Sequence, residues 1–416
     1  MKQILHTPEG VRDIYGIEYR KKLILEEKLQ NVLHMFGYQD VQTPMFEYFD
    51  VFGKEIGTLP SKELYKFFDK EGNTLVLRPD ITPSIARVIS TVFEKEDMPI
   101  RVCYKGNTFV NHSNYQGRLR ETTQLGAELI GDDSVEADAE MIAMAIESLK
   151  EAGLSDFQIN IGNVDFFEGL IEETQLSEEN EALLCEFIQN RNFFGVEELL
   201  DSVQAKVTTK AAFQILPELI GGAEVMKEAK KIALSFKVLE AVKRLEKIYE
   251  VLVSYGVEKY VTFDLSMSGT HGYYTGIIFR GYTYGTGDAI VKGGRYDNLL
   301  EKFGKKSPSV GFVIVVDELV SAFTRQKLEI VCEHKNTLVL YDECRRTEAI
   351  SLAKEFRSKG KQTELIKKEK HKSLEDYSAY GKQNLCISML YLKQNKEIEM
   401  VNLLNGKKKV VAMKIK

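Results

Sequence analysis

The pattern of apolar and polar positions predicts a helix near the N-terminus, over residues 18–36. Its apolar positions recur at helical spacing and are Leu25, Leu29, Val32, Leu33 and Phe36. Gly37 follows directly, and glycine is the residue that most often ends a helix. The next stretch, YQDVQTPMFEYFDVF, is interrupted by Pro44. Because proline cannot donate to a strand ladder, we expect this stretch to be extended and to lie at a sheet edge or an interface.

A short hairpin is predicted next, in the stretch LYKFFDKEGNTLVLRPDITPSIARV. Its turn falls at residues 70–73, and its second strand leads to the RPD sequence that ends at Asp80. Pro83 then stands just inside a predicted helix, where its fixed φ angle is favourable. Asp80, Thr82 and Ser84 crowd the start of this helix, so they would either cap it or bind a ligand.

The central stretch of the chain, residues 101–133, alternates in polarity and predicts a long hairpin. Its return strand is expected from about Arg118 to Ile130. Four polar side chains on this strand are evenly spaced, which places them on one face of the sheet: Arg118, Arg120, Gln124 and Glu128. That face is either exposed to solvent or buried around a ligand, because burying such groups without a partner is costly. We favour a ligand.

Residues 164–260 are densely periodic with few strand signals, which predicts a helical insertion. Sheet-like sequence rich in glycine and tyrosine returns afterwards. There, Tyr273 and Tyr274 would either pack a strand face or line a site. The Gly293-Gly294 pair is expected to form a tight turn that opens a helix. The stretch SPSVGFVIVVDELVSAF then predicts a buried strand that leads into a helix.

The pattern changes again near residue 333. Short apolar strands alternate with helical stretches from there on, which predicts a separate α/β module of about 85 residues. A chain of 416 residues is long enough for two or three domains. We expect one domain over residues 1–330, with the insertion at 164–260 inside it, and a second over residues 331–416.

Composition is typical of an ordinary globular protein, with 44% hydrophobic and 28% charged residues. The sequence contains no apolar run long enough for a membrane span, and its start is too polar for a signal peptide. The five cysteines are scattered, without a paired spacing or a histidine cluster at metal-ligand spacing. We therefore expect reduced thiols, no metal site and a cytoplasmic location.

Charge is unevenly distributed along the chain. Residues 331–416 hold 19 Lys and Arg against 11 Asp and Glu, a net charge of +8. Because the whole chain has a net charge of −6, residues 1–330 have a net charge of −14. A basic tail could contact nucleic acid. Because its lysines are spread rather than gathered, apart from residues 407–409, a solvated surface is the favoured interpretation.

The order of these blocks resembles the class II aminoacyl-tRNA synthetases, and in detail the histidyl-tRNA synthetase family. The Pro44 stretch matches the family's dimer-forming first motif, LRPDITPSIAR (77–87) is similar to its LRPEGT block, and the central hairpin is similar to its second motif. YYTG (273–276), GGRYD (293–297) and PSVGFVIVVDEL (308–319) resemble later signatures. The resemblance implies an α+β fold, with an antiparallel sheet flanked by helices, a helical insertion and a C-terminal α/β domain like a shortened anticodon-binding domain.

The resemblance also implies a histidine pocket. The candidate histidine-binding residues are Asp80, Thr82, Gln124, Glu128, Tyr273, Tyr274 and Arg118. Asp80 stands where the family has a glutamate that holds the α-amino group, and Thr82 and Gln124 match its helpers. Glu128 and Tyr274 match the groups that recognise the imidazole. A carboxylate suits an ammonium, while a second carboxylate and a phenol can pair with two ring nitrogens.

The contacts to ATP, by contrast, are not kept. Val110 and Gly269 stand where the family has arginines, His112 replaces a glutamate, and Glu318 replaces the arginine that stacks on adenine. Adenylate formation needs cations around the α-phosphate, and losing one such group typically costs about 3 kcal/mol. Three lost arginines are hard to reconcile with adenylation, so no catalytic residue and no cofactor are expected.

A synthetase-like chain with a histidine pocket and no ATP machinery resembles the regulatory subunits of ATP phosphoribosyltransferase. That resemblance implies a non-enzymatic partner of the short-form catalytic subunit, in the first step of histidine biosynthesis. It also implies feedback inhibition with histidine as the effector, and a homodimer within a hetero-octamer. Neither nucleic acid nor a membrane is an expected partner. The alternatives are a divergent histidyl-tRNA synthetase and a binding-only paralogue that serves another enzyme or an RNA.

Overall fold

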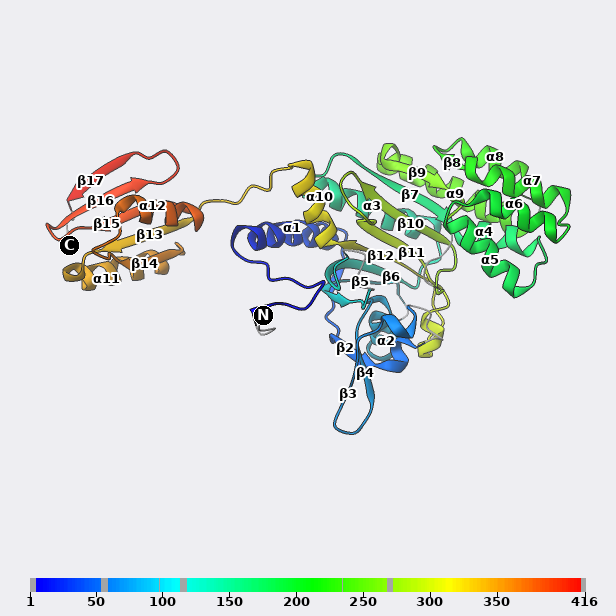
Figure 1. Ribbon diagram of the computed structural model, residues 1–416, viewed down its shortest axis with the longest axis horizontal. Coiled ribbons are helices and arrows are strands. Elements are labelled where there is room, and N and C mark those ends of the chain that lie inside the picture. The colour runs from blue at the N-terminus through cyan, green and yellow to red at the C-terminus, as the bar shows by residue number, and fades with distance from the viewer. Residues whose placement is uncertain are drawn as a thin grey trace. The chain divides into compact units, whose positions relative to one another are not determined.

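The computed structural model describes residues 5–53, 59–96, 98–112, 118–233, 235–267 and 272–412 (Figure 1). Contacts divide the chain into two units. The first holds the residues up to Asp13 and Leu25–Leu328, and the second holds Ile14–Ile24 and Glu329–Lys416. Within the described ranges, every helix is too short or too polar to cross a membrane.

The first unit is built on a nine-stranded sheet with the order β1-β5-β6-β12-β11-β10-β7-β9-β8. In that order the strands are Gln39–Asp40, Ile100–Phe109, Glu121–Ile130, Ser309–Val315, Val291–Arg295, Ile277–Thr283, Phe157–Asn163, Val261–Asp264 and Ile220–Gly221. The pairs β1–β5 and β7–β9 are parallel and the other pairs are antiparallel. This agrees with the class II synthetase-like sheet expected from the sequence.

The long helices of this unit follow their sequence patterns. They are α2 (Thr82–Val92), α3 (Val135–Ala152), α9 (Phe236–Tyr255), α10 (Val316–Gln326) and the part of α1 (Gly16–Met35) from Leu25 onward, since the start of α1 belongs to the second unit. Helix α3 illustrates why they form: the Ser134 hydroxyl accepts from the backbone of Ala137, and Gly153 ends the helix with φ +102°. Its apolar side packs on β12 and α9. Helix α3 thus has a capped start, an apolar packing side and a terminal glycine, all within one stretch of sequence.

A separate three-stranded sheet holds the Pro44 stretch. Its order is β2-β4-β3, with β2 at Phe46–Tyr48, β4 at Thr74–Leu77 and β3 at Lys66–Phe68. The predicted hairpin turn is confirmed, with Gly72 at φ +87°. Arg78, which is buried, donates to the carbonyl oxygens of Thr43 and Asn107 at 2.9 and 2.8 Å. Its guanidinium therefore ties the stretch before β2 to β5.

The predicted helical stretch is present after β7. Its further elements are α4 (Val164–Glu172), α5 (Glu178–Gln189), α6 (Phe193–Ser202), α7 (Val207–Ile215), η4 (Leu216–Glu218) and α8 (Val225–Lys231), before α9. Figure 1 shows α4–α8 gathered beyond the β9–β8 end of the sheet. Short helical turns elsewhere are η2 (Phe49–Phe52), η3 (Ser61–Glu63), η5 (Glu258–Tyr260), η6 (Leu300–Phe303) and η7 (Glu343–Arg345).

The prediction that the Gly293-Gly294 pair forms a turn opening a helix is wrong. Both glycines lie inside β11, which runs to Arg295. A Cβ at Gly293 would collide with the ring of Phe279 and with the Cβ of Phe312. The sequence uses glycine here to let large side chains cross the strand rather than to bend the chain.

A buried ionic cluster joins β11, α3 and α9. Asp138 is fully buried and accepts from Arg295 at 2.7 and 2.9 Å and from Arg244 at 2.8 Å. Arg295 also bonds Asp297 at 3.1 Å. The arginine of the GGRYD sequence is thus a structural residue that anchors two helices to the sheet.

The second unit contains a five-stranded sheet with the order β14-β13-β15-β16-β17. Its elements are β13 (Asn336–Tyr341), α11 (Arg346–Ser358), β14 (Thr363–Lys367), α12 (Leu374–Gln383), β15 (Cys386–Leu392), β16 (Glu397–Asn402) and β17 (Lys408–Ala412). Strand β13 is parallel to β14 and β15, while β16 and β17 complete the sheet with antiparallel pairs. The alternation of strands and helices predicted for this segment is therefore present.

Candidate functional site

The candidate site is built on the β5–β6 hairpin. Strand β6 begins at Glu121, so the prediction of a strand from about Arg118 was wrong by three residues. Arg118 and Arg120 precede the strand, and the backbone of Arg120 instead bonds Gly10 at 2.7 Å. Gln124 and Glu128 do lie on β6, opposite Gly106 and Val102 of β5. Only these two of the four polar residues therefore share a sheet face.

Glu128 lies at the centre of this face and is almost completely buried. Its Oε1 accepts from the hydroxyls of Thr82 at 2.9 Å and Tyr104 at 3.0 Å, and its Oε2 accepts from Tyr296 at 2.6 Å. No described Lys or Arg forms an ion pair with it. Burial raises the pKa of Glu128 to about 7, because the hydroxyl donors only partly offset the loss of water.

Glycines on the same sheet face make room for these side chains. A Cβ at Gly311, opposite Glu128 on β12, would overlap the Glu128 carboxylate. A Cβ at Gly126 would lie 2.8 Å from the Tyr104 ring, and one at Gly294 would lie 2.7 Å from the Tyr274 ring. The side chains of Glu128, Tyr104 and Tyr274 therefore fit on this sheet face only because these three positions are glycine.

Asp80 stands beside Glu128 at the start of α2. Its Oδ2 accepts from the hydroxyl of Tyr273 at 2.8 Å, and its Oδ1 accepts from the backbone nitrogen of Thr82 at 3.2 Å. Thr82 therefore bonds both carboxylates. Tyr274 packs on Tyr273 with ring centroids 5.0 Å apart. Burial, followed by the charges of Asp80 and Glu128, raises the pKa of Tyr274, so its phenol stays protonated.

Gln124 supplies an unused acceptor on the same face. Its Oε1 is buried and accepts no hydrogen bond from the described residues. An unpartnered buried carbonyl oxygen is costly, and an ammonium or imidazole N–H would satisfy it. The cluster thus offers two carboxylates, one amide oxygen and phenol groups, a set that suits a small ligand with two cationic or N–H groups.

Most of the predicted site residues come together, but not all. One cluster contains Asp80, Thr82, Glu128, Tyr273 and Tyr274. Gln124 lies on the same strand as Glu128, four residues before it. Arg118 is exposed, and its charge acts on His112 and Asp288. The geometry therefore gives no support to Arg118 as a ligand-binding residue.

Two residues of the cluster were missed by the sequence reasoning. Tyr104 and Tyr296 both donate to Glu128, although Tyr104 was noted only as part of an alternating strand and Tyr296 only as part of the GGRYD sequence. A usable signal was present. Gly126 pairs with Tyr104 inside a strand, and glycine inside a strand often marks the close approach of another group.

The positions expected to contact ATP lie along the same hairpin and on α10. Val110 uses its backbone nitrogen to bond the Arg120 carbonyl at 2.9 Å, and its side chain carries no charge. Glu318 lies in the first turn of α10 beside Asp317. Burial and then the charge of Asp288 raise the pKa of Glu318. Gly269 lies outside the described residues.

Cations also lie on this part of the sheet. Lys292 of β11 and Arg280 of β10 are register partners, and Lys292 pairs with Asp288 at 2.9 Å. The charges of Lys292 and Arg118 both act on Asp288, and the charges of Lys292 and Arg325 act on Glu318. Asp288 and Glu318 therefore offset part of the positive charge that a triphosphate would need.

A second group of polar side chains joins α1, β1 and β5. The donor atoms of His34, Asp40 and Cys103 lie within 4.8 Å of one another. Asp40 bonds His34 at 3.0 Å and accepts from the Cys103 thiol at 3.4 Å. Burial raises the pKa of Cys103 to about 12, so the thiol keeps its proton at neutral pH. These mutual hydrogen bonds account for the group, and we assign no metal to it.

Comparison with known proteins places this geometry in a family. Residues 10–319 match the family model described as histidyl-tRNA synthetase. Among curated proteins, the chain is 42% identical to an ATP phosphoribosyltransferase regulatory subunit from Acetivibrio thermocellus, over 86% of this chain and 85% of the relative. It is 40% identical to a protein of the same name from Thermoanaerobacter pseudethanolicus, over 90% of this chain and 98% of the relative.

Solved structures give a consistent result. A crystal structure described as an ATP phosphoribosyltransferase regulatory subunit/histidyl-tRNA synthetase from Bacillus halodurans superposes with a TM-score of 0.81 and 34% identity, covering 90% of this chain and 96% of that one. A histidyl-tRNA synthetase from Nostoc gives a TM-score of 0.79 at 20% identity, covering 98% and 96%. The second comparison concerns the fold alone.

Proposed function

The chain belongs to the histidyl-tRNA synthetase-like family of ATP phosphoribosyltransferase regulatory subunits, and we propose that it partners the short-form catalytic subunit of that enzyme. Its curated relatives carry the name ATP phosphoribosyltransferase regulatory subunit. In this role it would support the first step of histidine biosynthesis and make that step sensitive to histidine.

One observation carries the proposal: the site keeps a ligand cluster on one side and acidic groups on the other. Asp80, Thr82 and Glu128 form a hydrogen-bonded cluster around which Tyr273 and Tyr274 pack. We propose that histidine binds there, with its ammonium near Asp80 and Gln124 and its imidazole near Glu128 and Tyr274. A binding site without adenylating groups is what a sensor requires.

Feedback inhibition follows from differential binding. A ligand shifts an equilibrium between two quaternary states only if it binds one state more tightly than the other. We propose that histidine favours the inhibited state of the complex. The carboxylates of Asp80 and Glu128 would provide the affinity difference, because small shifts of α2 against β6 would change both contacts. A histidine site at a subunit interface is the competing location.

The proposed assembly is a homodimer within a hetero-octamer. The small sheet supports the dimer, because one of its faces carries Phe46, Tyr48 and Phe67, which are 51%, 58% and 37% exposed. Exposed aromatic groups clustered on one sheet face are typical of a protein interface. We place the dimer contact on this face, next to the Pro44 stretch.

Domain boundaries and location complete the proposal. We assign residues 1–330 to a synthetase-like domain, with the insertion at 164–260, and residues 331–416 to a module similar to a shortened anticodon-binding domain. All five cysteines are free, which is consistent with a reducing compartment, and we propose a cytoplasmic location. We propose no contact with nucleic acid for the second module, since its lysines are dispersed.

A divergent histidyl-tRNA synthetase is the second candidate. Lys292 and Arg280 favour it, because they are cations on the same sheet face as the ligand cluster. Against it stand Val110 and Glu318, which replace cationic positions of the family. The two functions differ in one reaction, the histidine-dependent exchange of pyrophosphate into ATP.

The test combines three measurements on the purified chain. Calorimetry is expected to show histidine binding, and the exchange assay is expected to show no pyrophosphate incorporation. The purified short-form catalytic subunit is expected to become active only when this chain is added, and histidine should then inhibit it. Robust exchange, or charging of transfer RNA, would overturn the proposal in favour of a synthetase.

A further inference from the structure

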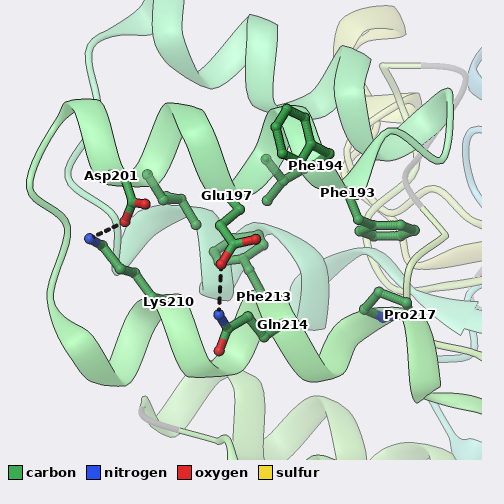
Figure 2. Close-up of a pocket in the computed structure, with 10 residues that line it drawn as sticks. Phe193, Phe194, Glu197, Asp201, Lys210, Phe213, Gln214 and Pro217 are labelled. Atoms are coloured by element: carbon green, nitrogen blue, oxygen red, sulfur yellow. Dashed lines mark hydrogen bonds and ion pairs between the residues drawn. The ribbon is translucent and has the colours of Figure 1, made fainter.

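The helical insertion contains a cavity of about 330 Å³ that shares no residue with the ligand cluster. Its apolar walls are formed by Phe193, Phe194, Val196, Leu200, Phe213 and Pro217, which come from α6, α7 and η4. Figure 2 shows Phe193 and Phe194 at one side of the cavity and the polar ends of Asp201 and Lys210 at the other.

The walls differ sharply in exposure. Val196, Leu200 and Phe213 are each 2% exposed, so they belong to the core of the insertion. Phe194 is 70% exposed, although it stands beside these buried groups. Covering this side chain would remove apolar surface from water, which favours binding. An exposed aromatic ring at the edge of an apolar hollow is the usual form of an anchor site for a partner side chain.

The polar rim is ordered by its own hydrogen bonds. Lys210 donates to Asp201 at 2.5 Å, and Gln214 donates to Glu197 at 3.2 Å (Figure 2). The one cation of the rim is therefore already neutralised. Glu197, by contrast, accepts from the neutral amide of Gln214 rather than from a cation. The neighbouring Glu198 is also exposed.

The acids at the rim outnumber its one lining cation. Glu197 and Asp201 line the cavity beside Lys210, and the exposed Glu198 follows Glu197 on α6. The wider stretch 165–201 contains 11 Asp and Glu and a single basic residue, Arg191, but Asp165, Glu168 and Glu172 in it pair with Lys237. The exposed acids Glu197 and Glu198 therefore favour basic groups on a partner, because charged protein partners are steered together by complementary potentials.

We propose that this cavity is a docking site for a short amphipathic segment of the catalytic partner chain. The segment would insert an aromatic or branched apolar side chain beside Phe194 and Phe213, and its flanking Lys or Arg residues would pair with Glu197 and Glu198. The proposal rests on the proposed function, since the partner is the catalytic subunit that a regulatory subunit has to contact. Recognition of an amphipathic helix in an apolar groove is a common mode of binding.

The experiment measures the affinity of this chain for the purified short-form catalytic subunit by calorimetry. Phe194→Ser removes an exposed ring and is expected to weaken binding about tenfold or more, the size of a central anchor residue. Glu197→Lys is expected to weaken binding about tenfold, with a reduced dependence on salt. Two matched controls lie in the same insertion away from the cavity: Phe236→Ser, whose ring is 77% exposed, and Glu178→Lys on α5. Both should stay within about twofold of the wild type.

The outcomes separate the two proposals. If the wild type binds and both cavity variants bind equally well, the docking site is wrong and the proposed function stands. If the wild type does not bind the catalytic subunit, both proposals are wrong. A wild type that binds transfer RNA, with loss of that binding in Phe194→Ser, would also overturn the docking site. Histidine binding is measured for every variant and should be unchanged, because no cavity residue belongs to the ligand cluster.

Discussion

Gly311 on β12 lies directly opposite Glu128 on β6, and a Cβ at position 311 would overlap the Oε2 of that carboxylate. Gly311→Ala therefore has to displace a buried side chain that three hydroxyl groups hold. Overpacking of this kind typically costs about 1–3 kcal/mol. We expect the free energy of unfolding to fall by that amount and histidine binding to be lost, as measured by urea unfolding and calorimetry.

Gly287→Ala is the matched control for this change, since nothing lies within 4 Å of a Cβ at that position. Wild-type histidine affinity in Gly311→Ala would show that the ligand does not depend on the position of Glu128.

The pH dependence of stability should report on Glu128 itself. Burial raises its pKa from 4.5 to about 7, so the folded state keeps a proton that the unfolded chain releases. Its favourable contribution is therefore complete below the unfolded pKa and is lost as the pH rises through the folded pKa. Relative to Glu128→Gln, the wild type should lose up to about 3 kcal/mol between about pH 4.5 and pH 8. Urea unfolding at several pH values checks this, and a constant difference would contradict it.

Asp80→Asn should weaken histidine binding without unfolding the protein. The change removes the charge that the ammonium needs, while the amide oxygen can still accept from Tyr273. Hydrogen bonds to charged groups contribute about 1.5–3 kcal/mol, so we expect a loss of affinity of about ten- to a hundredfold by calorimetry. Asp133→Asn, an exposed acid at the start of α3, is the control and should bind as the wild type does.

The buried ionic cluster should be among the most sensitive positions for stability. Asp138→Asn leaves Arg295 and Arg244 without their carboxylate, and breaking a buried pair on one side typically costs about 3–5 kcal/mol. Glu147→Gln removes an exposed pair with Lys150 on the same helix, which should cost less than about 1 kcal/mol. Equal losses in urea unfolding would mean that the buried cluster has no special role.

The exposed aromatic face of the small sheet predicts the dimer contact. Tyr48→Glu places a charge in the middle of that face, between Phe46 and Leu75, and is expected to give a monomer in sedimentation velocity. Tyr284→Glu changes a ring that is 80% exposed on another part of the first unit and should leave the dimer intact. A dimeric Tyr48→Glu protein would place the contact elsewhere.

Local pattern was sufficient for much of the fold. Helix α3 is marked by a cap, a stripe and a terminal glycine that all lie within one stretch of sequence. The start of β6 was missed because the backbone of Arg120 pairs with Gly10, more than a hundred residues earlier, which no local alternation records. Likewise, Gly293 and Gly294 signal a turn locally, while their packing against Phe279, Phe312 and Tyr274 is visible only in the folded sheet.

The ligand cluster could be predicted even less from local sequence pattern, because its residues are far apart in the chain. Tyr273 and Asp80 are 193 residues apart in sequence, so their hydrogen bond follows from topology rather than from spacing. Family resemblance supplied these two. It did not mark Tyr104, which lies in an alternating strand, or Tyr296, which lies in the GGRYD sequence. The place of Tyr104 depends on Gly126 opposite it, and the hydrogen bond of Tyr296 to Glu128 joins residues 168 apart, so neither follows from local pattern.

Thr82 has a consequence for which molecules this cluster can accept. Its backbone nitrogen donates to Asp80 and its hydroxyl donates to Glu128, so a single residue sets the separation of the two carboxylates. Any ligand that engages both must present its two donors at that one separation. A shorter or longer amino acid would reach only one of the two carboxylates and would lose a charged contact, which rejects analogues more strongly than a missing apolar contact does. We therefore expect Thr82 to determine the length of the amino acid that this cluster selects.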